Sequence, residues 1–207
     1  MVILIPARMG SKGLPGKNRI LFDYTAKIIP KNLVSKTYVS TNDDVIKDKA
    51  QHYGFNIAHR SEDLSKDETS MKDVVMDFTK TNKVNDKILL LYLTYPQRTW
   101  QDVNNAIKEM EESESKSLLC AFECESHPFL AIYDTQNNKG TQVVKHDLYR
   151  RQDYPKCLEI SHLVSIFYSN DLINLNSNLY NEDTHFMKCE KKIDIDLPIH
   201  FEKFKEK

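Results

Sequence analysis

The sequence predicts an open, three-layer α/β fold built on a mostly parallel sheet. Segments typical of strands and of amphipathic helices alternate along the chain with short links, and parallel strands need such crossovers. The apolar run 87–93 is nearly continuous, as in a strand covered on both faces. Three of the five glycines, Gly10, Gly13 and Gly16, directly follow the first apolar run. Since ligands bind beyond the carboxyl ends of such strands, this loop is the first candidate site.

The first half of the chain carries the clearest alternation. The expected elements are a strand from Ile3, a helix at 22–30, a strand at 36–41, a helix at 43–53, a strand at 55–58 and a helix at 69–82. Asn42 can cap the second helix, and Asp43 and Asp44 favour its dipole. Gly54 can end it. The third helix has one apolar face, which predicts packing against the sheet.

The second half continues the pattern with one interruption. We expect the strand 87–93, a helix at 100–112, strands at 117–123, 129–134 and 163–169, and a terminal helix after Pro198. The stretch 134–140 is polar and rich in turn residues, which is typical of a hairpin tip. The chain 1–207 is therefore expected to form a single domain with an excursion at about 134–160.

Composition restricts the function classes. The 207 residues are 40% hydrophobic and 29% charged, and the net charge of -1 gives no basic excess for nucleic acid. No apolar run approaches the length of a membrane span, and no leader pattern is evident. The four cysteines have no C-x-x-C spacing, which favours free thiols over disulfides. We expect a cytoplasmic protein without a nucleic-acid or membrane partner.

The glycine-rich loop has the chemistry of a polyphosphate site. Glycine allows the backbone to approach a ligand, and consecutive N–H groups in such a turn can bind an anion. Arg8, Lys12 and Lys17 add three positive charges. The spacing matches neither the P-loop nor the dinucleotide fingerprint. A basic surface turn is the alternative interpretation.

A second signal lies near the other end of the chain. Asp194 and Asp196 are two residues apart, so on an extended chain both carboxylates point the same way and can reach one hard cation. Alternatively, they cap the terminal helix or pair with lysines.

Five motifs together resemble the nonulosonate cytidylyltransferases, the family of CMP-sialic acid synthetases that also handles legionaminic and pseudaminic acids. They are R-x-G-S-K-G-x-P-G-K-N from Arg8, V-S-T-N-D from Val39 with Y-G-x5-R from Tyr53, L-x-x-T-x-P-x-R from Leu91, R-R-Q-x-x-P from Arg150, and D-I-D-x-P-x-H-F from Asp194. The resemblance implies a Rossmann-like nucleotidyltransferase fold in which the excursion serves as a dimerisation arm.

The resemblance also implies roles for individual residues. The implied nucleotide-binding residues are Arg8, Gly10, Ser11, Lys12, Gly13, Lys17, Asn18 and Arg60, the last reading the cytosine edge. The implied sugar-binding residues are Tyr92, Thr94, Arg98, Arg151 and Gln152. Asp194 and Asp196 would hold Mg2+, and Lys17, Arg8 and Asp196 would carry the catalysis. The implied activity is transfer of CMP from CTP to an acidic sugar, in a homodimer.

The chain departs from the family pattern at several points. Met9 replaces a glycine, Tyr92 and Leu93 replace Gln-Pro, and Ser161 and His162 stand near an expected N-G. The connection after Asn18 is also shorter. These changes leave the acceptor open, and two rival interpretations remain: a cytidylyltransferase for another acidic sugar, such as 3-deoxy-manno-octulosonate, and a nucleotide-binding homologue that has lost catalysis.

Overall fold

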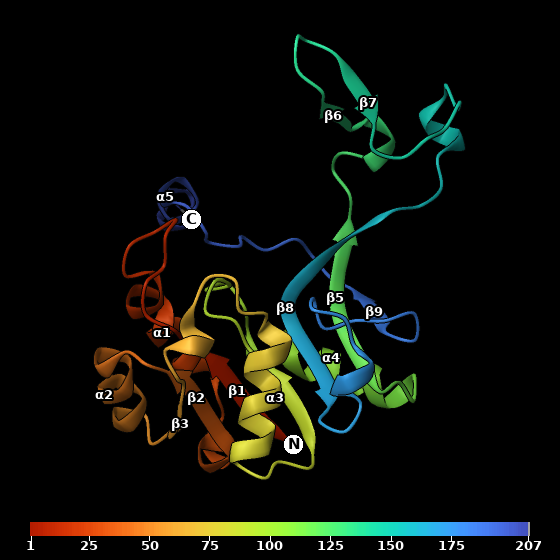
Figure 1. Cartoon of the computed structure of the whole chain (residues 1–207). Helices are drawn as coiled ribbons and strands as arrows, with labels where there is room; N and C mark the ends of the chain where they lie inside the picture. Colours follow the sequence, from red (N-terminus) through yellow and green to blue (C-terminus); the bar gives the residue numbers. More distant parts are fainter. Residues whose placement is uncertain (207) are drawn as a thin grey trace.

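The computed structural model describes residues 1–206, which form a seven-stranded sheet with the order β3-β2-β1-β4-β8-β5-β9. The strands are β1 (Val2–Pro6), β2 (Thr37–Thr41), β3 (Asn56–His59), β4 (Lys87–Leu90), β5 (Ser117–Glu123), β8 (Leu158–Tyr168) and β9 (His185–Lys188). Strand β8 runs antiparallel to both β4 and β5, while the other neighbours are parallel (Figure 1). The predicted mostly parallel α/β sheet is confirmed.

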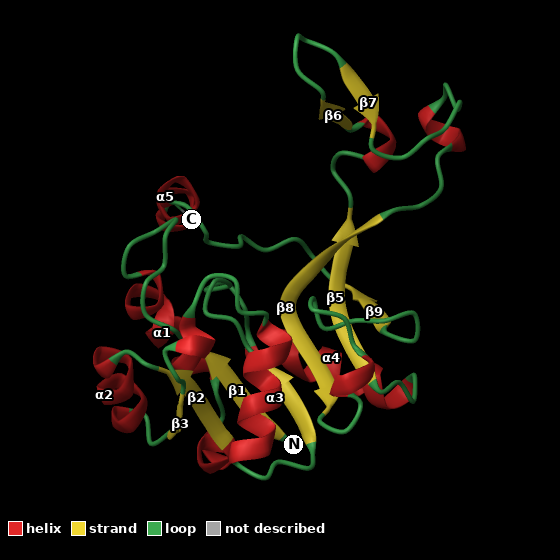
Figure 2. Ribbon diagram, viewed as in Figure 1, coloured by secondary structure: helices red, strands yellow, loops and turns green. Residues whose placement is uncertain are grey.

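Helices cover both faces of this sheet (Figure 2). Ile3 and Ile5 of β1 belong to the core that includes buried residues of α1 (Lys17–Ile28), α2 (Asp44–His52) and α4 (Trp100–Glu112). Leu4 points to the opposite face and belongs to the core with Phe78 of α3 (Met71–Thr81). The alternation along β1 thus builds the three predicted layers, because successive strand side chains face opposite sides.

Several predicted boundaries are corrected by local contacts. Helix α1 begins at Lys17, directly after the glycine loop, rather than at residue 22. Asp43, and not Asn42, caps α2 by accepting a hydrogen bond from the Val45 amide. The Asn42 side-chain oxygen instead accepts a hydrogen bond from the Met9 amide at 2.9 Å. Because the Asn42 side chain is engaged by the Met9 amide, Asp43 caps the helix instead.

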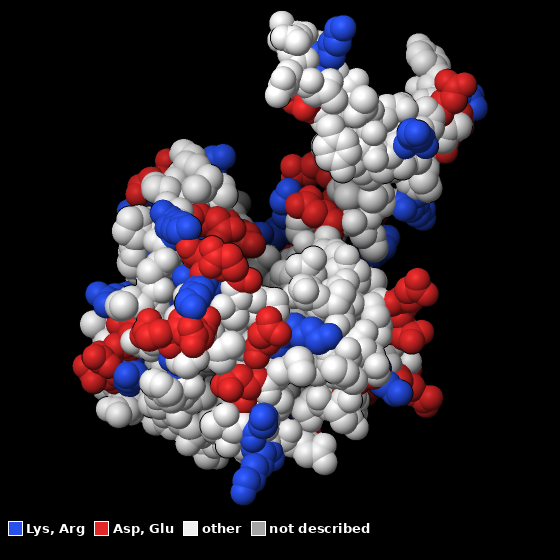
Figure 3. Space-filling model, viewed as in Figure 1, with Lys and Arg blue, Asp and Glu red and all other residues white. Residues whose placement is uncertain are grey.

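The excursion leaves the sheet between β5 and β8 and starts about ten residues earlier than predicted. It contains the hairpin of β6 (Ile132–Asp134) and β7 (Gly140–Gln142) and projects away from the body (Figure 1). We call residues 124–157 the arm. Its surface carries exposed apolar side chains, including Ile132, Tyr133 and Tyr149, and is mostly uncharged in the view of Figure 3. Within the described residues, no helix is both long and apolar enough to cross a membrane.

Arg98 is a structural residue of the core, which contradicts its predicted contact with a sugar. Its side chain is only 2% exposed. Its guanidinium donates hydrogen bonds to the Leu163 carbonyl, the Thr25 hydroxyl and the Tyr92 carbonyl, each at 2.9 Å. Burial lowers the pKa of Arg98 to about 10. Arg98 thus links β8 and α1 to the loop after β4 through hydrogen bonds.

We expect Arg98→Met to destabilise the fold by about 3–5 kcal/mol, because it leaves three buried acceptors without a donor. Urea unfolding followed by circular dichroism measures this loss. Arg150→Met is the matched control, since Arg150 is 68% exposed and pairs with Asp153 on the arm; it should cost less than about 1 kcal/mol. Equal stabilities of the two variants would contradict the supporting role of Arg98.

Candidate functional site

The glycine loop connects β1 to α1 at the carboxyl edge of the sheet. Gly10 has a φ of 86° and Gly16, the residue before α1, has a φ of 69°. Both values lie in the left-handed region that favours glycine. The Asn18 side chain donates a hydrogen bond to the Arg8 carbonyl at 2.8 Å, which joins the two ends of the loop. Helix α1 thus begins where the loop ends, and no side chain in the described part of the chain caps its N-terminus, an arrangement that can bind an anion.

The segment near the C-terminus crosses the same edge and contacts this loop. In Figure 1 it runs from β9 over the body to α5 (Pro198–Lys205). Ile195 is fully buried, and its amide donates to the Thr94 carbonyl at 2.8 Å. Asp194 and Asp196 flank this anchor, and the Asp196 side chain is 61% exposed. The alternation expected from an extended chain thus places the two carboxylates on the outer side.

Gly13 and Lys17 are the loop residues that contact this segment. A Cβ on Gly13 would overlap the Asp196 carbonyl oxygen. The Lys17 ammonium lies 2.6 Å from the Asp196 carboxylate. Close approach of the two backbones therefore explains the glycine at position 13, and it brings together the two charged groups predicted from opposite ends of the chain.

Asp67 is a partner of the loop that sequence reasoning missed. Its two carboxylate oxygens lie 2.5 Å from Arg8 and 2.5 Å from Lys12. Hydrogen bonds from Lys12 and Arg8 lower the pKa of Asp67. Arg8 also donates to the Ser65 carbonyl at 3.1 Å. The only sequence signal was that Asp67 follows Arg60 closely, and so lies beyond the carboxyl end of β3.

A cavity of about 220 Å³ opens beside this ion-pair cluster. Predicted site residues that line it are Arg8, Ser11, Lys12, Lys17, Asn18, Arg60, Tyr92 and Thr94. Arg60 is buried, and its Nε donates to the Leu64 carbonyl at 2.8 Å. Burial and the nearby charge of Arg8 lower the pKa of Arg60 to about 10. The cavity thus has a strongly cationic wall.

A second cavity of about 180 Å³ adjoins the first, since Arg8, Ser11 and Asn18 line both. Its wall includes an ion pair that the sequence did not predict. Arg19 donates two hydrogen bonds to the Asp43 carboxylate, at 2.7 and 3.0 Å. Because Asp43 is buried and also caps α2, this pair fixes one wall of the second cavity.

The carboxylates of Asp194 and Asp196 are suitable ligands for a magnesium ion that is also bound by phosphates. Desolvation raises the pKa of Asp194, with a smaller contribution from the charge of Asp196, while hydrogen bonds from Thr94 and Tyr95 oppose the shift. The described residues contain no cluster of three or more metal-ligating side chains. Two carboxylates fit Mg2+, which commonly takes one or two of them together with substrate phosphates and water.

Comparison with known proteins identifies the family. A family model described as cytidylyltransferase matches residues 2–206. The chain belongs to the cytidylyltransferase family. Its similarity to solved structures extends over the whole fold: a CMP:2-keto-3-deoxy-manno-octonic acid synthetase solved with CTP has 16% identity and a TM-score of 0.68, covering 99% of this chain and 96% of that one.

Several curated relatives share more of the sequence. An N-acylneuraminate cytidylyltransferase from Streptococcus agalactiae is 29% identical over 73% of this chain and 39% of its own length. The chain thus matches about two fifths of that relative. A CMP-N,N'-diacetyllegionaminic acid synthase from Legionella pneumophila is 28% identical over 96% of this chain and 92% of its own. A pseudaminic acid cytidylyltransferase from Campylobacter jejuni is 30% identical over 74% and 72%, respectively.

In this member of the family, the two main departures from the family pattern contact each other. The rings of Tyr92 and His162 have centroids 5.2 Å apart and are tilted by 52°. Both side chains are half-buried. Burial lowers the pKa of His162, so a neutral imidazole is favoured. His162 therefore packs against Tyr92, whose ring lines the cavity.

The structure does not bring Arg151 and Gln152 to the glycine loop. Both lie in a short 3-10 helix (Arg151–Asp153) on the arm and are exposed. Arg151 lines a different cavity, at the base of the arm. Within one copy of the chain these two predicted sugar-binding residues thus remain apart from the other site residues.

We expect Gly13→Ala to separate the loop from the terminal segment, because its Cβ would overlap the Asp196 carbonyl. Overlap in a packed region costs about 1–3 kcal/mol. Hydrogen exchange at the Ile195 amide, which bonds to Thr94, should become faster in this variant.

Gly16→Ala is the matched control in the same loop. A Cβ there meets no atom within 4 Å, so only its positive φ carries a cost. Exchange at Ile195 should be unchanged in this control. If both variants left the Ile195 amide equally protected, the contact between Gly13 and Asp196 would be refuted.

Proposed function

We propose that this chain activates a nonulosonic acid with CTP and Mg2+, giving a CMP-sugar and pyrophosphate for the synthesis of a surface polysaccharide or glycan. The observation that carries the proposal is the meeting of the Lys17 ammonium and the Asp196 carboxylate at the glycine loop, 2.6 Å apart. A triphosphate needs cations at its leaving oxygens and a metal near its reacting phosphorus. Both requirements can be met at this point. Membership of the family and the names of the relatives support the same reaction.

The cations of the cavity would bind the triphosphate. Arg8 and Lys12 form ion pairs with Asp67, and Lys17 forms one with Asp196. These pairs keep all three cationic side chains near the cavity. An incoming triphosphate would take over these positive charges, together with the Ser11 hydroxyl and the loop amides. We assign Lys17 the largest role in the transition state, because negative charge then shifts toward the pyrophosphate.

The remaining nucleotide contacts follow from position. Asn18 is fixed on the Arg8 carbonyl and would orient ribose or phosphate. Arg60 lines the same cavity as the cations and would read the cytosine edge. Its buried guanidinium has little freedom, which suits recognition of a planar base.

Asp194 and Asp196 would hold Mg2+, which supplies charge neutralisation at the phosphates when it is bound. The sugar would present its anomeric hydroxyl to the α-phosphate of CTP, and Asp196 would accept the proton that this hydroxyl loses. Lys17 would then exchange its partner, leaving Asp196 for the phosphate oxygens. Tyr92 and Thr94 would contact the acceptor sugar from the same cavity.

In a homodimer, the arm would complete the sugar-binding part of the site. Its exposed apolar surface, including Ile132, Tyr133 and Tyr149, suits burial against a second copy of the chain. Arg151 and Gln152 would then reach the sugar carboxylate of the partner's site, with arginine able to bind it through two hydrogen bonds. We place the reaction in the cytoplasm.

The function is tested by pyrophosphate release from CTP with Mg2+ and a panel of acidic sugars that includes sialic, legionaminic and pseudaminic acids and 3-deoxy-manno-octulosonate. We expect release with a nonulosonic acid and little with 3-deoxy-manno-octulosonate. Calorimetry with CTP alone provides the second measurement. Binding of CTP without release from any acceptor would favour a homologue that has lost catalysis, and release with 3-deoxy-manno-octulosonate alone would reassign the acceptor.

We expect Lys17→Ala to lower kcat by about 10²- to 10³-fold, the usual effect of removing one group that stabilises transition-state charge. The affinity for CTP should fall much less, because Arg8 and Lys12 remain. Lys108→Ala is the control, since this lysine is 76% exposed on α4. Equal losses in kcat and in CTP binding would contradict the transition-state role of Lys17.

A further inference from the structure

Two cysteines face each other where the arm joins the sheet. The last pair of the β5–β8 ladder is Glu123 with Leu158. Cys124 directly follows β5 and Cys157 directly precedes β8, and the Cys124 amide donates to the Cys157 carbonyl at 3.3 Å. Both ends of the arm thus leave the body through this one pair of residues.

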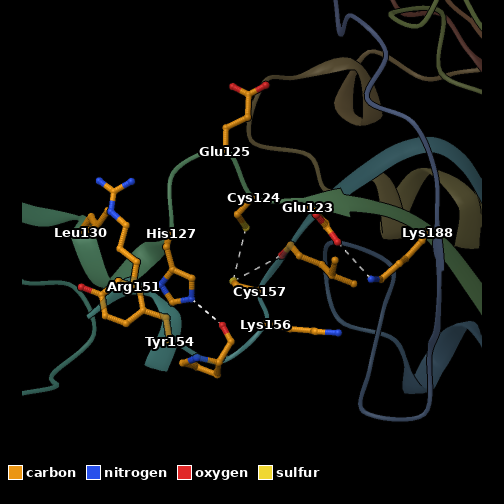
Figure 4. A pocket seen from close by; sticks show the side chains of 12 residues that line it. Glu123, Cys124, Glu125, His127, Leu130, Arg151, Tyr154, Lys156, Cys157 and Lys188 are labelled. Atoms are coloured by element: carbon orange, nitrogen blue, oxygen red, sulfur yellow. Dashed lines mark hydrogen bonds and ion pairs between the residues drawn. The ribbon is translucent and has the colours of Figure 1, made fainter. Parts of the chain in front are cut away.

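The two thiols are in contact. Their sulfur atoms lie 3.5 Å apart and point toward each other across the strands (Figure 4). Facing residues of an antiparallel pair have Cα atoms about 4.5–5.5 Å apart. Disulfides span about 4.4–6.8 Å between Cα atoms, so the strand spacing suits a bond without a backbone shift. Rotation of the side chains would bring the sulfurs to bonding distance.

A small oxidant can reach this pair. Cys124 and Cys157 are both half-buried and line a cavity of about 390 Å³ at the base of the arm. The charged residues that line this cavity are of both signs: Arg151, Lys156 and Lys188, and also Glu123 and Glu125. Partial desolvation and the neighbouring thiol raise the pKa of Cys124. Reaction should therefore be faster at alkaline pH.

We propose that Cys124 and Cys157 are a site of reversible disulfide formation that closes the arm at its base. The oxidant is a small-molecule disulfide. One protein thiolate attacks a sulfur of this molecule and releases one small thiol, leaving a mixed disulfide. The second protein thiolate then attacks the protein sulfur of that bond and releases the other small thiol. Two protein thiols are oxidised by two electrons, and the small disulfide is reduced to two thiols that carry the two protons.

The bond would convert the arm into a covalently closed loop. In the reduced form, the Cys124–Cys157 rung is held by a backbone hydrogen bond and thiol contact, so the base of the arm can open locally. The closed form would hold β5 and β8 together up to the last residue of the body. This inference concerns the arm alone and does not depend on the reaction that the loop cavity carries out.

The test uses the full chain incubated with glutathione disulfide at pH 8. The readouts are alkylation of free thiols under denaturing conditions and intact mass. Two of the four cysteines should become protected, with a mass two hydrogens lower and no retained glutathione. Peptide mapping should join the peptide of Cys124 to that of Cys157. Reduction should restore four free thiols.

Serine variants provide the controls. Cys124→Ser and Cys157→Ser should each retain glutathione on the remaining arm cysteine, since no second thiol is near to displace it. Cys189→Ser should form the internal bond as the natural chain does. Four free thiols after oxidation, a link between Cys120 and Cys189, or a bond between two copies of the chain would each overturn the proposal.

Hydrogen exchange tests the structural effect separately. Amides at the base of the arm, including that of Cys124, should exchange at least tenfold more slowly in the oxidised chain than in the reduced chain. Amides of the distant helix α2 should be unaffected. Unchanged exchange at the base of the arm would refute the closure.

Discussion

The contact between the glycine loop and the segment around Asp196 is the constraint on which the candidate site depends. Gly13 lets the two backbones approach, and Lys17 pairs with the Asp196 carboxylate. The segment is held there by the buried Ile195 side chain and by its hydrogen bond to Thr94. The loop supplies cations and the segment supplies carboxylates, so only their meeting would create the site that we propose for a triphosphate and a divalent cation.

Carboxylates compensate every cation that we assign to the triphosphate. Asp67 holds Arg8 and Lys12, and Asp196 holds Lys17. Since exposed ion pairs in water are weak, a triphosphate with several charges can displace them at modest cost. The pairs also keep flexible side chains near the cavity before the nucleotide arrives. Binding is then an exchange of anions around cations already in place.

Local signals allowed the fold to be predicted, and long-range contacts account for the errors. Helix α4 was placed correctly at 100–112, and the structure shows that Thr99 and Asp102 form a capping box at its start. The position of the glycine loop after β1 also followed from its residues alone. The burial of Arg98 could not be predicted, since its acceptors come from α1, β8 and the loop after β4.

The candidate site was predicted to a similar extent. The loop cations and the aspartate pair could be named because their spacing carries their chemistry. Asp67 was missed, because nothing in the sequence reveals a carboxylate that two distant cations share. The arm starts about ten residues earlier than expected, because the predicted strand 129–134 belongs to the hairpin of β6 and β7 and not to the main sheet. Contacts between distant segments decide each of these points.

The separation of Lys17 and Asp196 along the chain also affects how the protein is made. The two residues are 179 positions apart. At a synthesis rate of about 5–20 residues per second, the ribosome reaches Asp196 roughly 10–35 seconds after Lys17. During this interval the nascent chain displays a basic loop that lacks its acidic counterpart from the terminal segment. The pair of Lys17 and Asp196 can therefore form only after the ribosome has passed the segment around Asp196.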